Sequence, residues 1–431
     1  MHLNRLLSLC VVSLVLNAAS GVNPPPPGPP GRPQPPGSAI NDPSVLPKQP
    51  SVRVEPTRHT PMPSVDPMRP QIGQPLPGLT TDQLNLFLDG LEDFEKVEDV
   101  AGGLGPTFNN TSCVSCHSAP VAGGASTTNV VRFGRVTGTT FDALESLGGT
   151  LLQSQAILPE AQEFVPTQAN VVINRNSTPL FGLGLIDAIP DAAILANVRT
   201  VPVDGVLGKA ASVTDVVSGK TRIGRFGWKS QQATLLGFAA DAYLNEMGVT
   251  NRYFPNENAP NGNAVALAHT DMIADPEDAP ATGLADFEKV ANFMRYLAPA
   301  PVAPLTPSAA TGQKLFTSMG CALCHVPALS TGPSADPAFN RKPVKLFSDL
   351  LLHDMGTLGD GIVQGPAGAR EMRTSPLWGL RFSAPYLHDG RALTVDQAIR
   401  AHDGEGKVSR DRYIKLTPVQ QSQLRDYLLS L

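Results

Sequence analysis

Two short cysteine motifs constrain this chain more than any other feature. They share the spacing Cys-x-x-Cys-His and comprise Cys113, Cys116 and His117 in the first copy and Cys321, Cys324 and His325 in the second. In this spacing the thiols form thioethers with the vinyl groups of a haem, and the adjacent histidine turns onto the iron as an axial ligand. We therefore expect two covalently bound c-type haems.

The cysteine count agrees with this expectation. The chain has five cysteines, and the fifth, Cys10, lies in an apolar N-terminal stretch that we expect to be removed. A zinc site would need four ligands drawn together, and a redox-active dithiol would need a strand before it and a helix after it. Because glycines precede both motifs and both carry the histidine, haem attachment is the favoured interpretation.

The first 78 residues differ in character from the rest. Residues 1–20 carry Arg5, the apolar run Leu6 to Leu16 and small residues up to Ser20, a pattern that predicts a signal peptide, with a retained anchor as the alternative. Residues 21–78 hold 19 of the 42 prolines, which predicts an extended linker or a disordered segment. Removal of a signal peptide implies a periplasmic or secreted protein.

Charge and hydropathy argue against two classes of protein, nucleic-acid binders and integral membrane proteins. The chain has 33 Lys and Arg against 38 Asp and Glu, a net charge of −5, and no basic stripe. A nucleic-acid partner is therefore not expected. Since the N-terminal apolar run is the only long one, we expect no integral membrane span once the signal has been removed.

Amphipathic patterns begin at residue 79 and are mostly helical. Thr80 and Gln83 form a capping box at the start of one helix, and a second helix should end before Pro299. The segment 299–307 contains four prolines and reads as a linker. Few segments alternate with period two. We predict a mainly α fold with only minor sheets, in two domains at 79–298 and 308–431 joined by long irregular loops.

The chain also repeats itself. The segment 177–183, Ser-Thr-Pro-Leu-Phe-Gly-Leu, recurs at 374–380 as Thr-Ser-Pro-Leu-Trp-Gly-Leu, a shift of 197 between the prolines of Thr-Pro and Ser-Pro. The cysteine motifs recur with a shift of 208. Two features that repeat at similar offsets indicate a duplicated module.

Each proximal histidine leaves one axial position on its iron. The candidates to fill it are His269, His353, His388 and His402. His402 follows a short helical stretch that would direct it toward the C-terminal haem, whereas the others could be surface or loop residues. No histidine lies between His117 and His269. An iron without a strong sixth ligand can bind peroxide or oxygen, while a doubly ligated iron mainly passes electrons.

The motifs resemble the bacterial di-haem oxidoreductase family, which is related to the di-haem cytochrome c peroxidases. The resemblance runs from about Pro75 to the C-terminus and is carried by Gly103-Leu104-Gly105-Pro106, Thr178-Pro179-Leu180-Phe181-Gly182-Leu183, Arg225-Phe226-Gly227-Trp228-Lys229, Leu352-His353-Asp354-Met355-Gly356 and Pro385-Tyr386-Leu387-His388-Asp389-Gly390. It implies two cytochrome c-like haem domains.

The resemblance also implies roles for single residues. It places His402 as the second ligand of the C-terminal haem, where peroxidases usually have Met. It leaves the N-terminal haem open or ligated by a remote residue such as Met247 or His269. A peroxidatic site needs a proton-transferring group, for which Asp187, Asp191 and Glu163 are the candidates. Trp228 would lie between the haems and assist electron transfer.

Together these expectations describe an exported di-haem oxidoreductase. The C-terminal haem would pass electrons from a partner such as a small cytochrome or cupredoxin to a substrate-facing N-terminal haem, where a small oxidant such as peroxide would react. Two other functions remain open at this point. One is an electron carrier without turnover, and the other is an oxygenase that acts on a protein or a polymer.

Overall fold

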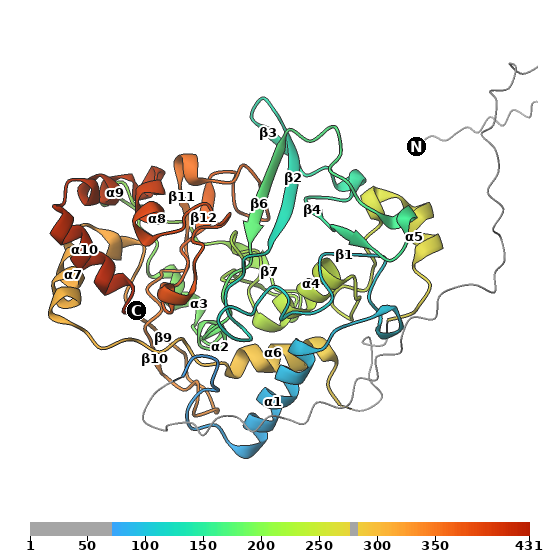
Figure 1. The fold of residues 1–431 in the computed structure, drawn as a ribbon, viewed down its shortest axis with the longest axis horizontal. Helices are drawn as coiled ribbons and strands as arrows, with labels where there is room; N and C mark the ends of the chain where they lie inside the picture. Colours follow the sequence, from blue (N-terminus) through green and yellow to red (C-terminus); the bar gives the residue numbers. More distant parts are fainter. Residues whose placement is uncertain (1–70, 276–282) are drawn as a thin grey trace, which may run out of the picture. The chain divides into compact units, whose positions relative to one another are not determined.

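Helices and small antiparallel sheets both contribute to the fold (Figure 1). The computed structural model describes residues 71–275 and 283–431, so the predicted signal peptide and most of the proline-rich segment lie outside the described residues. The structure is 33% helical and 16% strand. The prediction of a mainly α fold is therefore wrong, and the fold is mixed α and β.

Helices α1 and α6 form the main helix pair in the first half of the chain. Helix α1 (Thr81–Glu95) opens with the predicted Thr80/Gln83 capping box, and α6 (Asp286–Tyr296) ends before Pro299 as expected. The two pack through Phe293, whose ring centre lies 5.2 Å from that of Phe87 and 4.7 Å from that of Phe94. The other helices here are α2 (Leu183–Asp187), α3 (Asp191–Leu195), α4 (Leu235–Met247) and α5 (Ala264–Thr270).

The largest sheet has four antiparallel strands. Strand β2 (Asn129–Thr137) pairs with β3 (Thr140–Asp142), β4 (Leu151–Leu152) and β6 (Val171–Asn176). The β2–β6 ribbon stands out in Figure 1 and forms the longest ladder, six residue pairs from Asn129–Asn176 to Gly134–Val171. Two-stranded sheets join β1 (Thr107–Phe108) to β5 (Gln155–Ala156), β7 (Ser212–Thr214) to β8 (Thr221–Ile223), β9 (Leu329–Ser330) to β10 (Pro343–Val344) and β11 (Leu352–Asp354) to β12 (Glu371–Arg373).

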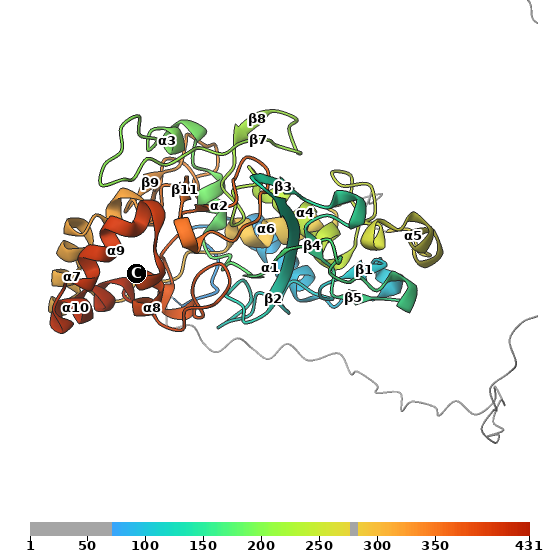
Figure 2. The ribbon, with the colours of Figure 1, turned by 90° about the horizontal axis from the view of Figure 1, so that it is seen from above.

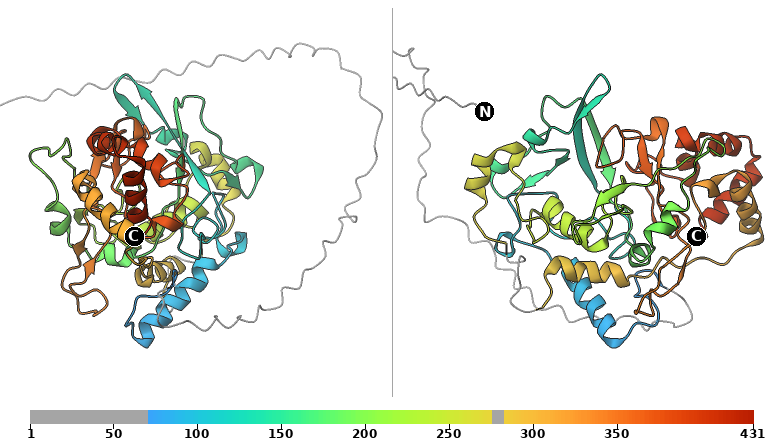
Figure 3. Two further views of the ribbon diagram at one scale, coloured as in Figure 1. Left: turned by 60° about the vertical axis from the view of Figure 1, so that its left-hand side comes forward. Right: turned by 180° about the vertical axis from the view of Figure 1, so that it is seen from behind.

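Four helices from the last part of the chain lie together around the C-terminus in Figures 2 and 3. They are α7 (Pro307–Ser318), α8 (Val395–Ala401), α9 (Lys407–Ile414) and α10 (Pro418–Leu428). Helix α10 has the capping box of Thr417 and Gln420 expected from Thr417-Pro418, and α7 packs on it through Phe316 and Tyr427. Among the described residues, no helix has the length and apolarity needed to cross a membrane.

The apolar core does not stop at the predicted boundary between the two halves. The larger core cluster runs from Leu76 to Leu297 and also takes in Phe339, Leu346 and Trp378. A smaller cluster contains Phe316, Val395 and Tyr413 of the C-terminal helices. The segment 298–306 has no helix or strand, in keeping with a linker. The division into two haem domains at 299–307 remains a prediction.

The duplication seen in the sequence extends to the backbone. Gly182 and Gly379 both have positive φ, 73° and 68°, and each caps a helical segment, α2 and the 3₁₀ turn Leu380–Phe382. Positive φ is the conformation that favours glycine. The sequence repeat therefore corresponds to a structural repeat.

A second repeat is visible only in the structure. Phe226 forms a β-bridge with Gln232, and 160 residues later Tyr386 forms one with Ala392. In each copy a threonine, Thr234 or Thr394, then caps a helix, α4 or α8. We call residues 226–247 and 386–402 the first and second turn–helix units.

Through these turns the two halves of the chain contact each other in a nearly symmetric way. The Asn176 N–H donates to the carbonyl of His388 (2.6 Å), and the Arg373 N–H donates to that of Trp228 (2.9 Å). Asn176 corresponds to Arg373 by the shift of 197, and Trp228 corresponds to His388 by the shift of 160. Each half thus makes the same backbone contact with the other, as in an isologous dimer.

Candidate functional site

Both cysteine motifs fold as one tight turn. The His117 N–H donates to the carbonyl of Cys113 (3.1 Å), and the His325 N–H donates to that of Cys321 (2.9 Å). All four cysteines are free of disulfides. Burial raises the pKa of the Cys113 and Cys321 thiols to about 12 each. Each motif therefore presents two protonated thiols and a histidine from a single loop.

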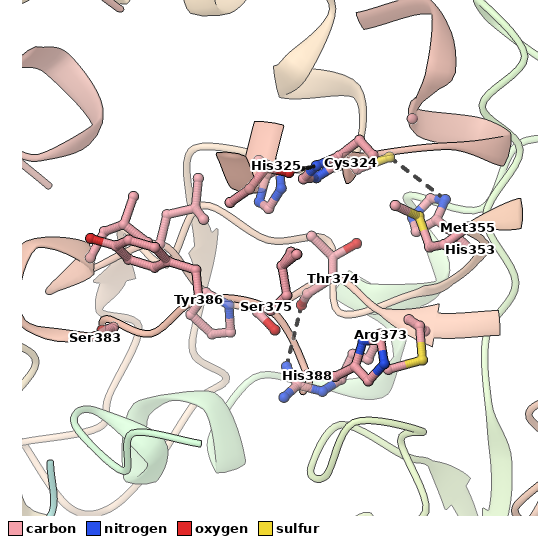
Figure 4. Close-up of a pocket in the computed structure, with 18 of the residues that line it drawn as sticks. Cys324, His325, His353, Met355, Arg373, Thr374, Ser375, Ser383, Tyr386 and His388 are labelled. Atoms are coloured by element: carbon pink, nitrogen blue, oxygen red, sulfur yellow. Dashed lines mark hydrogen bonds between the residues drawn. The ribbon is translucent and has the colours of Figure 1, made fainter. Parts of the chain in front are cut away.

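A cavity of about 270 Å³ opens beside the second motif. Its wall includes Cys321, Cys324, His325 and His402, and it extends to Thr178 and Trp228 of the first half of the chain. Figure 4 shows Cys324 and His325 on one side of this space and Arg373 and His388 on the other, with Thr374 and Ser375 between them. The cavity thus joins the C-terminal motif to the contact between the two repeats.

His325 and His402 face each other across the cavity as a pair. Their ring centres lie 6.4 Å apart. Nδ1 of His325 lies 3.0 Å from the carbonyl oxygen of Phe347, and Nδ1 of His402 lies 2.8 Å from that of Ala398. These contacts fix Nδ1 as the protonated nitrogen and leave Nε2 for a metal, as is usual for ligating histidines.

The residues around this pair fit a haem. A bond from a metal to an imidazole nitrogen is about 2 Å long, so two imidazoles on opposite sides of one metal have ring centres roughly 6 Å apart. Burial and the neighbouring His402 lower the pKa of His325 to about 4, and burial also lowers the pKa of His402. Both rings are neutral, which is the form that binds a metal.

Two other candidate histidines have different surroundings. His353 is buried, with Nε2 2.9 Å from Asp349 and Nδ1 2.6 Å from Glu405. Burial lowers its pKa, but the bonds to Asp349, Cys324 and Glu405 outweigh this effect and raise the pKa to about 12. Both of its nitrogens are occupied by acceptors, so it is not suited to ligate iron. His388 is buried on the cavity wall with Nε2 3.8 Å from Asp389.

The first motif lies against the core of the first half. Nδ1 of His117 is buried and has no hydrogen-bond partner among the described residues, and burial lowers the pKa of this ring to about 4. The His117 carbonyl accepts from Gly123, whose own carbonyl accepts from Leu180. The repeat segment that contains Leu180 therefore links the first motif to the cavity.

The two residues considered as remote ligands of the N-terminal haem lie in different environments. Met247 is buried in the larger core cluster at the end of α4. His269 is exposed on α5. Ligation of the N-terminal haem by either residue stays a prediction.

Asp187 and Asp191 both lie near the buried Arg225. Asp191 forms an ion pair with Arg225 and with Arg222, and it accepts the N–H of Ile223 (3.0 Å). Burial raises the pKa of Asp191, but these donors outweigh burial and leave the pKa lowered. Burial raises the pKa of Asp187, whose carboxylate accepts the N–H of Leu235 at the start of α4. Asp191 thus acts as the counter-ion of Arg225.

Glu163 holds two loops together. Its two carboxylate oxygens accept the N–H groups of Gln153 (2.7 Å) and Asn261 (3.0 Å), and burial raises its pKa. Neither Glu163 nor the pair Asp187 and Asp191 lines the cavity at the second motif. Among the described residues on that wall, the only carboxylate is Glu405.

A group of charged residues that the sequence did not single out lies beside the first motif. Asn109 donates to Glu246 on α4 (2.9 Å), and the next residue, Asn110, contacts Sγ of Cys116 (3.7 Å). Burial raises the pKa of Glu246 and raises that of Asp241 to about 6, while the Arg132 guanidinium opposes both shifts. Nε of Arg132 is itself buried without a partner in the described part of the chain.

Trp228 lies where the two repeats meet. It lines the cavity, and its indole N–H donates to the carbonyl of Asn176 (2.8 Å). The indole and the ring of His388, its counterpart in the second unit, have centres 6.2 Å apart in an edge-on arrangement. Arg373 lines the same cavity and, unlike Trp228, is not among the predicted site residues.

Solved structures resemble the chain only distantly. Hydrazine synthase of Kuenenia stuttgartiensis is 16% identical over 84% of this chain and 90% of its own, with a TM-score of 0.40. The diheme peroxidase BthA of Burkholderia thailandensis is 13% identical over 84% and 87%, with a TM-score of 0.37. A MauG-like protein associated with microbial copper homeostasis is 17% identical over 64% and 94%, with a TM-score of 0.31.

The family assignment depends on the sequence instead. A comparison with curated proteins gave no match. The family model described as "Di-haem oxidoreductase, putative peroxidase" matches residues 165–431. This range holds the second cysteine motif, both turn–helix units and His402, while the first cysteine motif lies before it. With more than half of its length matched, the chain belongs to the di-haem oxidoreductase family.

Proposed function

We propose that this protein is an exported c-type di-haem enzyme that reduces peroxide at its N-terminal haem with electrons received through its C-terminal haem. Cys113 and Cys116 would attach the first haem and Cys321 and Cys324 the second. His117 and His325 would be the proximal ligands. The observation that carries the proposal is a difference between the two turn–helix units at one position.

In the second unit that position is His402, eight residues after the capping Thr394. The residue eight after Thr234 in the first unit is Ala242, which has no atom able to bind iron. Helix α4 lies beside the first motif, since Asn109 and Asn110 donate their N–H groups to the carbonyl of Glu246. The C-terminal iron would have two imidazole ligands, and the N-terminal iron would keep a position open for a small oxidant.

The first unit also offers a proton-transferring group. Residues four apart on a helix share a face, so Glu246 points to the same side of α4 as Ala242. Burial raises the pKa of Glu246, which favours a carboxyl that can both hold and release a proton. Asp241 and Arg132 lie close enough to influence this carboxyl electrostatically. We therefore place proton transfer at Glu246 rather than at Glu163, Asp187 or Asp191.

The reaction balances with an external electron donor. Hydrogen peroxide takes up two electrons and two protons, its O–O bond breaks, and two waters leave. The haem iron would supply the site at which peroxide binds and at which the electrons are delivered. Glu246 would move a proton between the peroxide oxygens, and a small cytochrome or cupredoxin would supply the electrons. Trp228, at the contact between the repeats, would lie between the C-terminal haem that gives the electrons and the N-terminal haem that receives them.

The first experiment counts and classifies the haems. A pyridine haemochrome assay should give two c-type haems per chain, and the ferric protein should contain one high-spin and one low-spin haem. Two low-spin haems that bind neither cyanide nor peroxide would instead indicate an electron carrier. Turnover of a polymer or protein without peroxide consumption would indicate an oxygenase.

The second experiment removes the proton carrier. Glu246→Gln should lower kcat for peroxide reduction by about 100-fold or more, because general acid–base catalysis contributes roughly 10²–10⁴. Haem content and spin states should stay the same. Glu160→Gln, which changes an exposed carboxylate, is the matched control. A kcat for Glu246→Gln within a few-fold of wild type would remove Glu246 from the proposal.

A further inference from the structure

Arg373 differs in its surroundings from two other buried arginines, Arg175 and Arg225. It ends β12, its side chain is buried, and it lines the cavity at the second motif. Its Nε donates to the carbonyl of Gly227 (2.8 Å), and its Nη1 lies 3.3 Å from the carbonyl of Thr374. These partners are dipoles, so they leave the positive charge of Arg373 uncompensated.

Two neighbouring buried arginines show the usual arrangement. Arg175 is paired with Asp360 (2.6 Å), and Arg225 is paired with Asp191. Within residues 71–275 and 283–431, Arg373 forms no ion pair, and burial alone lowers its pKa to about 10. A buried charge without a counter-ion costs several kcal/mol, so such charges are normally paired.

The rest of the cavity wall does not supply the missing anion. Its one described carboxylate, Glu405, is already bonded to His353. The other arginine on the wall, Arg410, is paired with Asp403 and Asp411. The wall therefore has an excess of positive charge located at Arg373. An arginine fork matches a carboxylate in geometry as well as in charge.

We propose that Arg373 is a carboxylate-binding site whose occupant is a propionate of the C-terminal haem. The inference rests on the proposed attachment of that haem to Cys321 and Cys324. The fit is chemical: a haem carries two propionate carboxylates, and the cavity that holds His325 and His402 offers one unpaired cation for them. Arg373 then links the haem to the backbone of Trp228, to whose carbonyl it donates.

The test measures the midpoint potential of the C-terminal haem in the full-length holoprotein. Arg373→Met should shift the ferric–ferrous equilibrium about tenfold toward ferric iron, a fall of about 59 mV for a one-electron couple, because the propionate charge is no longer balanced. The potential should also become pH-dependent as the unpaired propionate titrates. Arg373→Lys, which keeps the charge, should restore most of the potential.

Controls separate this inference from the proposed function. Each variant should still contain two c-type haems and show an unchanged low-spin signal, which would establish that the haem site is intact. If the wild type itself lacked the two c-type haems or the low-spin signal, the proposed function would be wrong. Arg370→Met removes an exposed cation from the segment that leads into β12 and should leave the potential unchanged. An unchanged, pH-independent potential in Arg373→Met would overturn the proposal.

A free carboxylate ligand is the other possible source of the same chemistry. If such a ligand is the occupant, acetate and succinate should perturb the C-terminal haem spectrum of the wild type saturably. They should leave the spectrum of Arg373→Met unchanged. Without ligand, the potential of Arg373→Met should equal that of the wild type. This result would assign the site to a substrate and overturn the propionate assignment. If Arg373→Met does not fold, Arg373→Lys still decides, since a shifted propionate band in its resonance Raman spectrum is expected only for direct contact.

Discussion

The two turn–helix units have the same backbone and, at one position, different chemistry. Each has a bridged turn and a threonine cap, followed by a helix beside a Cys-x-x-Cys-His motif. The second helix ends at Ala401, and His402 turns toward His325. The first continues through Ala242 to Met247 and carries Glu246 on the face of Ala242. Under the proposed function, this duplicated scaffold would provide a closed haem site in one half and an open one in the other.

The most direct test of the difference between the two units places a histidine in the first unit at the position that His402 has in the second. Ala242→His should convert the N-terminal haem from high to low spin and lower peroxide turnover by more than 100-fold, because the imidazole would occupy the position that peroxide needs. Ala242 is partly exposed, so a larger side chain has space. Electronic spectra and stopped-flow peroxide reduction provide the measurements.

Ala242→Leu is the control for this prediction, since it adds volume without a ligand atom. It should leave the N-terminal haem high-spin. If Ala242→His also stays high-spin and active, then α4 does not face the distal side of the first haem, and the correspondence between the units fails at this position.

The reverse change opens the second site. His402→Ala should convert the C-terminal haem to high spin with attachment intact and slow electron delivery about 10-fold or more. His402→Met should keep it low-spin and raise its potential, because His/Met ligation gives higher potentials than bis-His. Magnetic circular dichroism and spectroelectrochemistry distinguish the two. Spectra of His402→Ala identical to wild type would show that His402 is not a ligand.

These predictions also show what the sequence could and could not reveal. Ligation by His402 could be predicted because its distance from a recognisable turn is fixed, and haem attachment could be predicted because the chemistry of the cysteine motifs is local; both stay predictions. The proposed role of Glu246 could not be predicted from the sequence, since it depends on the equivalence of Thr234 and Thr394. The two units share little sequence, and their offset of 160 differs from 197 and 208, so the equivalence exists only in the backbone.

The sheets were missed for a related reason. From Val171 to Arg175 the enclosed and exposed positions of β6 alternate, but Val172 is exposed while Arg175 is buried against Asp360. The opposite strand, β2, carries another enclosed arginine, Arg132. A period-two pattern of apolar residues identifies strands only when the buried face is apolar. Here enclosed arginines replace part of that face.

The counter-ion of Arg225 gives a prediction on stability. Asp191→Asn should lower the free energy of unfolding by about 3 kcal/mol, because it leaves a fully buried guanidinium without its charge partner. Haem ligation in the folded variant should be unchanged, since Asp191 lies away from the cavity wall. Denaturant titration followed at both haems is the measurement.

The pH dependence of this effect has a defined sign. The folded-state pKa of Asp191 is lowered, and that of an unfolded Asp is about 3.9. The stabilisation is therefore present above pH 4 and lost as the pH falls through the folded pKa. The difference between wild type and Asp191→Asn should shrink below pH 4. A difference that is constant from pH 7 to pH 3 would show that the pair does not depend on the charge of Asp191.

The smallest effects compare the two threonine caps. Thr394 accepts the N–H of Gln397, whereas Thr234 accepts that of Gly237 and also donates to Asp215 (2.7 Å). Thr394→Ala should lower the free energy of unfolding by about 1 kcal/mol, the usual value of an N-cap. Thr234→Ala should cost about 2 kcal/mol, because a second hydrogen bond to a charged group is lost. Only Thr394→Ala should also broaden the low-spin haem signal, since α8 is a seven-residue helix that positions His402. Equal costs with no spectral change would mean that the two caps serve only their helices and that ligand placement in the second unit depends on the loop after Ala401.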